Sequence, residues 1–101
     1  MIPMINLEEK IHELAGKPWH PIEVARVNDQ VVRMGFCRGE YHWHKHTNED
    51  ELFYVLRGEL TIQLRDDADI TLREGELAVI PKGVEHCPKS VGDTYILMFE
   101  P

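Results

Sequence analysis

The first apolar pattern in the chain has the spacing of a short helix. Leu7, Ile11 and Leu14 recur at i, i+4 and i+7, which places them on one face of a helix. Asn6 is suited to cap the start of this helix, and Pro18 stops it. We expect the helix to pack on the rest of the chain, because an isolated helix of about ten residues is unstable in water.

From residue 19 onward the pattern changes to short runs with the two-residue period of β-strands. Turn residues separate these runs at intervals of roughly 8–12 residues, which favours an all-β sandwich or barrel. The expected strands cover residues 21–27, 31–37, 41–46, 51–57, 60–65, 70–73, 77–80 and 94–99. We therefore predict a helix and lead-in over residues 1–18 and one β-barrel domain over residues 19–101.

Length and charge narrow the range of functions. A chain of 101 residues has room for one domain. The net charge of −7, without a basic stripe, argues against nucleic-acid and membrane partners. No apolar run approaches the ~20 residues of a membrane span, and residues 1–5 do not resemble a secretory signal. We expect a cytoplasmic protein with two reduced thiols, Cys37 and Cys87.

Several residues of the kinds that bind metals follow one another along the chain. His42, His44 and His46 alternate, so in an extended strand they face the same side, and imidazole is the commonest metal ligand. Glu51 begins the next apolar run, and His86 follows a Pro-Lys-Gly turn. Singly these signals are weak, because a lone histidine after a turn is more often a hydrogen-bonded structural residue.

The spacing of the whole set resembles the two signature motifs of the cupins. The matching residues are His44-Lys45-His46, Glu51 and Gly58 for the first motif, and Gly75, Pro81-Lys82-Gly83 and His86 for the second. The chain is similar to the small single-domain cupins, which have a type-2 conserved barrel and include mannose-6-phosphate-isomerase-like members. This resemblance implies an all-β cupin barrel (a double-stranded β-helix, or jelly roll) with a short N-terminal helix.

The sequence departs from the family pattern at two positions and offers one alternative choice of ligands. Gly39 lies five residues before His44, where the family pattern usually has six, and Ser90 stands where the family usually has Asn. Glu49 follows the alternative pair His42 and His44 at the same spacing, but only Glu51 places the next glycine at the right distance. The resemblance therefore implies His44, His46, Glu51 and His86 as the metal ligands.

This ligand set leaves the identity of the metal and the reaction open. Imidazole and carboxylate ligands without a thiolate suit Mn, Fe, Ni, Co, Cu or Zn. The resemblance implies dioxygenase- or isomerase-type chemistry on a small oxygen-rich molecule. The alternatives are non-enzymatic binding or sensing of a sugar or keto acid, and a purely structural metal. No catalytic residue is assigned, although His42 and Tyr54 are candidate bases and Cys87 is an unfavoured thiol. The resemblance also implies a homodimer.

Overall fold

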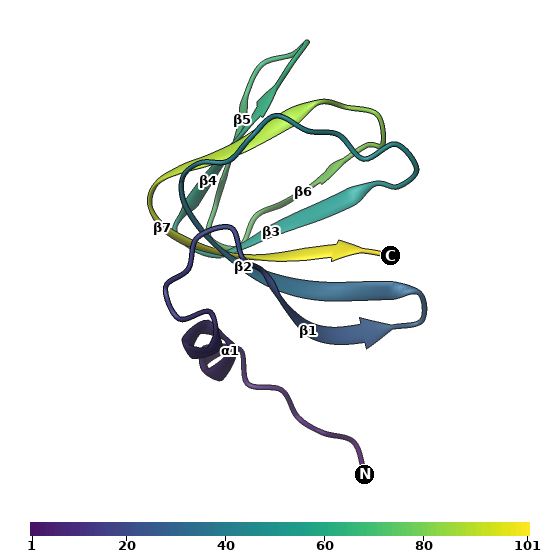
Figure 1. Cartoon of the computed structure of the whole chain (residues 1–101), viewed down its shortest axis with the longest axis vertical. Coiled ribbons are helices and arrows are strands. Elements are labelled where there is room, and N and C mark those ends of the chain that lie inside the picture. Colours follow the sequence, from purple (N-terminus) through teal and green to yellow (C-terminus); the bar gives the residue numbers. More distant parts are fainter.

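Seven strands form the barrel in the computed structural model, which describes all 101 residues (Figure 1). They are β1 (Ile22–Val27), β2 (Gln30–Glu40), β3 (Glu51–Arg57), β4 (Glu59–Leu64), β5 (Ile70–Arg73), β6 (Leu77–Ile80) and β7 (His86–Glu100). The strands pair in the order β1-β2-β7-β3-β6, while β4 pairs with both β5 and β7. All these pairings are antiparallel. The prediction of an all-β barrel with a short N-terminal helix is confirmed.

Strand β7 joins the parts of the barrel. Its C-terminal half pairs with β2 on one side and β3 on the other. Its N-terminal residues, from His86 to Lys89, pair with β4. The sequence pattern indicated only residues 94–99 of this strand, because Pro88 and Gly92 interrupt the alternation before them. The longer strand places His86 at one end and Glu100 at the other.

The segment from Tyr41 to His46 is not the regular strand that its alternation predicts. It forms one isolated bridge, between His44 and His86. The pairing of β2 with β7 shifts register after Cys37, and Gly39 follows with φ +79°. Glycine adopts this positive φ readily whereas L-residues disfavour it, and the pairing of β2 with β7 ends one residue later, at Glu40. The three alternating histidines therefore lie on an irregular segment and not on a strand, although their rings still follow one another at centroid distances of 5.3 Å.

The core fills the barrel beneath the histidine segment. On β3 the buried positions alternate, so that Glu51, Phe53 and Val55 face inward. The larger of the two core clusters consists of Cys37, Phe53, Val55, Leu60, Ile62, Leu72, Ile80 and Ile96. Because strand side chains alternate between faces, Glu51 shares the inner face with two core residues. Glu51, the one carboxylate on the inner face of β3, therefore lies at the edge of the core.

Helix α1 (Leu7–Glu13) covers the outside of the barrel near β1 and β2 (Figure 1). The Asn6 side chain caps it by accepting a hydrogen bond of 3.1 Å from the backbone N–H of Glu9. Leu14 is buried against Met34 and Phe36 of β2, which gives the helix the packing it requires. No helix in the structure has the length and apolar character that a membrane crossing requires.

Candidate metal centre

Backbone hydrogen bonds bring the two sequence motifs together. His44 and His86 exchange N–H···O bonds of 3.0 and 2.9 Å. The N–H of Gly83 donates to the carbonyl of His46 at 2.7 Å, and the N–H of Lys82 donates to the Asp50 carboxylate at 2.9 Å. The Pro-Lys-Gly turn is thereby attached to the histidine segment. Two stretches of chain some forty residues apart hold their side chains at one point.

The four residues that the sequence motifs suggest lie together. One ligand-type atom from each of His44, His46, Glu51 and His86 lies within 4.8 Å of all the others. Two ligand atoms that bind one ion at 2.0–2.2 Å are at most about 4.4 Å apart. The cluster is therefore close to the size that one ion requires, and some contraction brings all four atoms to it. Glu51 is 4% exposed and His86 is 1% exposed, so half of the set is buried.

Two of the imidazoles are oriented by backbone carbonyls. Nδ1 of His44 lies 3.0 Å from the carbonyl oxygen of His42, and Nδ1 of His86 lies 2.9 Å from that of Val84. A carbonyl accepts only, so each Nδ1 carries the hydrogen and donates it. In the neutral ring each Nε2 then has a free lone pair, which is the form of histidine that binds metals.

His86 provides the test of whether a metal fits. Its buried Nε2 has no hydrogen-bond partner, and the nearest Glu51 oxygen is 3.6 Å away, too far for a good hydrogen bond. A structural histidine in this position would be expected to satisfy both ring nitrogens, because an unpaired buried polar atom costs about 1–3 kcal/mol. A lone pair directed at two imidazoles and a carboxylate suits a divalent cation.

The charges in the cluster are coupled. Burial opposes ionisation of Glu51, but the neighbouring His86 and His46 outweigh it and lower the carboxyl pKa. Burial likewise opposes protonation of His86, but Glu51 and the Val84 carbonyl outweigh it and raise the imidazole pKa. Burial lowers the pKa of His44, and repulsion from the other two histidines adds to this effect. At neutral pH His44 is therefore held in its neutral, ligand-competent form.

These shifts predict how pH affects the stability of the metal-free protein. Glu51 has a pKa below its usual 4.5, so its stabilising contribution is present above pH 4.5 and is lost as pH falls through the lower value. His86 has a pKa above its usual 6.5, so its contribution is present below pH 6.5 and is lost as pH rises through the higher value.

We therefore expect the stability difference between wild type and Glu51→Gln to be largest between pH 4.5 and 6.5. Urea unfolding of both metal-free proteins across the pH range measures this difference. A difference that does not change with pH would contradict the ion pair.

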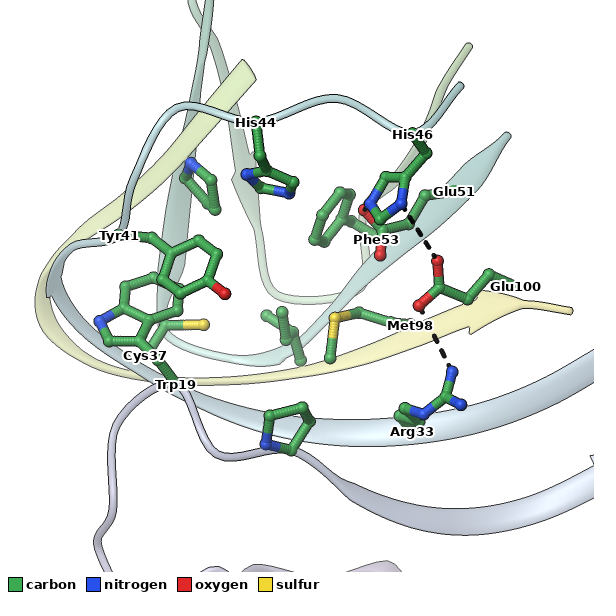
Figure 2. A pocket seen from close by; sticks show the side chains of 13 residues that line it. Trp19, Arg33, Cys37, Tyr41, His44, His46, Glu51, Phe53, Met98 and Glu100 are labelled. Carbon is green, nitrogen blue, oxygen red and sulfur yellow. Dashed lines mark hydrogen bonds and ion pairs between the residues drawn. The ribbon is translucent and has the colours of Figure 1, made fainter. Parts of the chain in front are cut away.

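A cavity of about 200 Å³ opens beside the cluster (Figure 2). Three of the four candidate ligands, His44, His46 and Glu51, line it. The remaining walls are mainly apolar or aromatic and contain Trp19, Pro21, Cys37, Tyr41, Phe53, Pro88, Ile96 and Met98. Burial raises the pKa of the Cys37 thiol to about 12, so it stays protonated. The cavity is large enough for a small molecule next to a bound ion.

One ion pair forms the polar corner of the cavity. Arg33 lies 3.3 Å from Glu100, and Glu100 lies 4.0 Å from Nδ1 of His46 (Figure 2). Nε2 of the same imidazole accordingly faces Glu51, at 3.1 Å. The Glu100 carboxylate thus favours the ring orientation that directs Nε2 toward the cluster. Carboxylates commonly orient metal-binding histidines in this way.

The other candidates from the sequence lie elsewhere. His42 and Tyr54 do not line the cavity, and Tyr54 alternates with the inward residues of β3. Cys87 is fully buried, and both cysteines are free thiols. Trp43 lies under the Arg65 guanidinium at 4.2 Å. The cavity residues that sequence reasoning missed include four with polar or aromatic side chains, namely Trp19, Arg33, Tyr41 and Glu100. No local pattern marks them, since they come from four separate segments.

Comparisons with known proteins agree with this fold. The cupin-domain family matches residues 30–100. The uncharacterized protein YdbB of Bacillus subtilis (strain 168) is 42% identical over 99% of this chain and 88% of its own length. The crystal structure of a cupin-2 domain containing protein from Shewanella frigidimarina NCIMB 400 superposes with a TM-score of 0.92 at 40% identity, covering 97% of this chain and 94% of that one.

A more distant relative is named as an enzyme. The 3-hydroxyanthranilate 3,4-dioxygenase 2 of Aspergillus fumigatus (strain CBS 144.89 / FGSC A1163 / CEA10) is 32% identical over 72% of this chain. The match spans only 40% of that dioxygenase. The family match over most of the barrel, the two near-complete relatives and the arrangement of both motifs lead to one conclusion: the chain belongs to the cupin family.

Proposed function

We propose that the protein holds one divalent transition metal through His44, His46, Glu51 and His86, and that it acts as a dioxygenase on a small oxygen-bearing molecule in the adjacent cavity. The observation that carries the proposal is the buried Nε2 of His86, which has no hydrogen-bond partner and faces the other three ligands. When bound, such a metal supplies Lewis-acid and redox chemistry toward dioxygen and oxygen-bearing molecules.

The protein supplies a preorganised site for that chemistry. The carbonyls of His42 and Val84 hold two imidazoles in the ligand-competent tautomer before any ligand arrives. Glu51 contributes one negative charge at low exposure, which offsets part of the charge of a divalent ion. Most of the remaining cavity wall is apolar or aromatic, and such surroundings strengthen electrostatic interactions beside them.

The cavity favours dioxygenase chemistry over isomerisation. An isomerase needs a base within hydrogen-bond reach of the substrate, and neither candidate base from the sequence, His42 or Tyr54, lines the cavity. Cys37 is held protonated. Outside the ligand set, the other wall groups able to take a proton are Glu100, which is paired with Arg33 at 3.3 Å, and the Tyr41 hydroxyl. The name of the Aspergillus relative also supports oxygen chemistry.

Oxygen consumption tests the proposal. Protein loaded anaerobically with Fe²⁺ is mixed with 3-hydroxyanthranilate, catechol, pyruvate or mannose 6-phosphate, and dissolved oxygen is followed with an electrode. We expect oxygen uptake that matches the loss of one of the two aromatic compounds, and no uptake with the His86→Ala variant. Tight calorimetric binding of pyruvate or the sugar phosphate without any turnover would instead support a non-enzymatic binding barrel.

A further inference from the structure

An aromatic pair forms one wall of the cavity. The rings of Trp19 and Tyr41 stack with a centroid separation of 4.9 Å and an interplanar angle of 28°. Figure 2 shows both rings on the side of the cavity opposite Glu100, with the Tyr41 hydroxyl directed inward. Tyr41 also meets His44 edge-on at 5.3 Å. The aromatic wall therefore continues directly into the candidate metal centre.

Trp19 is held in this wall by specific contacts. Its backbone N–H donates to the carbonyl of Phe36 at 2.9 Å, and its indole N–H donates to the carbonyl of Arg38 at 3.1 Å. Its backbone has φ +63°, a conformation that costs a non-glycine residue about 1–2 kcal/mol. These two hydrogen bonds and the surrounding packing must offset that strain, so they hold the indole in one defined position.

The rest of the cavity offers few hydrogen-bonding groups. Cys37, Phe53, Ile96 and Met98 form its apolar surface, and the ion pair of Arg33 and Glu100 occupies one corner. A sugar presents hydroxyls on every edge, and burying them against such a surface without partners is unfavourable. An apolar cavity of about 150 Å³ holds benzene, so about 200 Å³ is suited to one ring with small substituents.

We propose that Trp19 and Tyr41 form the recognition wall for a single planar aromatic ring whose oxygen substituents reach the metal. This inference rests on the proposed function, because it places the oxygen atoms of the ligand at the metal. It goes further in naming the substrate class as monocyclic and aromatic. It also makes the segment before β1, outside the matched residues 30–100, a determinant of specificity.

Three hydroxamates isolate the contribution of the ring. Acetohydroxamate, benzohydroxamate and cyclohexanecarbohydroxamate share one metal-binding group and differ in carrying a methyl, a planar ring or a saturated ring. They are titrated calorimetrically into protein loaded with Zn²⁺, which has no redox chemistry. We expect benzohydroxamate to bind about tenfold more tightly than either of the others. An aromatic ring contact supplies a gain in affinity of about this size.

Matched variants assign the effect to the wall. In Trp19→Leu and Tyr41→Leu we expect the preference for benzohydroxamate to fall by about tenfold, while the affinity for acetohydroxamate is unchanged. Tyr41→Phe keeps its ring and should keep the preference. Trp43→Leu is the control, because Trp43 is the other tryptophan and lies outside the cavity against Arg65. If Trp19→Leu does not fold, Tyr41→Leu carries the test, because Tyr41 is 37% exposed.

The outcomes separate the two proposals. If acetohydroxamate and benzohydroxamate bind equally well, the metal is accessible but the aromatic wall does not select, and the inference is wrong while the proposed function stands. An unchanged preference in both leucine variants overturns the inference in the same way. If none of the three compounds binds the Zn²⁺-loaded protein, the metal has no accessible position, and the proposed function fails together with the inference.

Discussion

Replacing His86 with alanine is expected to abolish metal binding. The wild-type protein should bind about one ion per chain, as a single cluster of four ligands does. The variant removes the only buried ligand-type nitrogen that has no other partner. Loss of an outer-shell partner alone costs roughly 10- to 100-fold in affinity, so loss of a direct ligand should cost more. Plasma mass spectrometry of protein purified without chelator or affinity metal measures the metal content.

His42→Ala is the matched control. This histidine belongs to the same segment, but its side chain does not line the cavity. Its ring packs against Tyr41 at a centroid distance of 3.8 Å, but its contact with Nδ1 of His44 is made by the backbone carbonyl at 3.0 Å, which alanine keeps. The control should retain the wild-type metal content. If His86→Ala also retained it, His86 would be a structural residue and the centre would need another ligand.

Replacing Gly58 with alanine is expected to destabilise the fold by about 3–5 kcal/mol, a large share of the stability of a small domain. Gly58 has φ +91°, and a Cβ there would lie 2.6 Å from both the carbonyl oxygen of Asp93 and the hydroxyl oxygen of Thr94. That hydroxyl also bonds the backbone N–H and carbonyl of Glu59, at 3.1 and 2.9 Å. The added methyl group therefore displaces backbone and breaks the start of β4. Urea unfolding of the metal-free protein measures the loss.

Gly75→Ala separates steric overlap from backbone strain. Gly75 has a similar φ of +83°, but a Cβ there would have no heavy atom within 4 Å. This variant should lose only about 1–2 kcal/mol, the cost of the left-handed conformation. Equal losses in the two variants would show that the close approach of β7 to Gly58 does not limit the fold.

The candidate ligands could be found in the sequence because each lies beside a local signal. The resemblance to the cupin motifs selects Glu51, because only this carboxylate lies at the motif's distance from Gly58. The two-residue period of β3 then places Glu51 on the inner face with Phe53. The Pro-Lys-Gly turn marks His86, since it requires the positive φ that Gly83 has. In these cases the geometry follows from a few consecutive residues.

The remaining parts of the site depend on contacts between distant segments. The alternation of residues 41–46 predicted a strand, but pairing is decided by neighbours, and β7 offers the segment only one bridge. Trp19, Tyr41 and Glu100 reach the cavity from the segment between α1 and β1, the segment after β2 and the C-terminal end of β7. Such convergence leaves no period or spacing in the sequence.

The position of β7 also gives the folding reaction an order. β2, β3 and β4 all pair with this one strand, which is the last in the chain. Folds that depend on such long-range pairings form in milliseconds to seconds, because distant segments must meet first. Three of the candidate ligands lie within residues 44–51, whereas His86 joins them only when β7 docks. Tight metal binding during refolding therefore requires that β7 has docked and closed the barrel. The rate at which the refolding protein binds metal then measures the rate of this docking step.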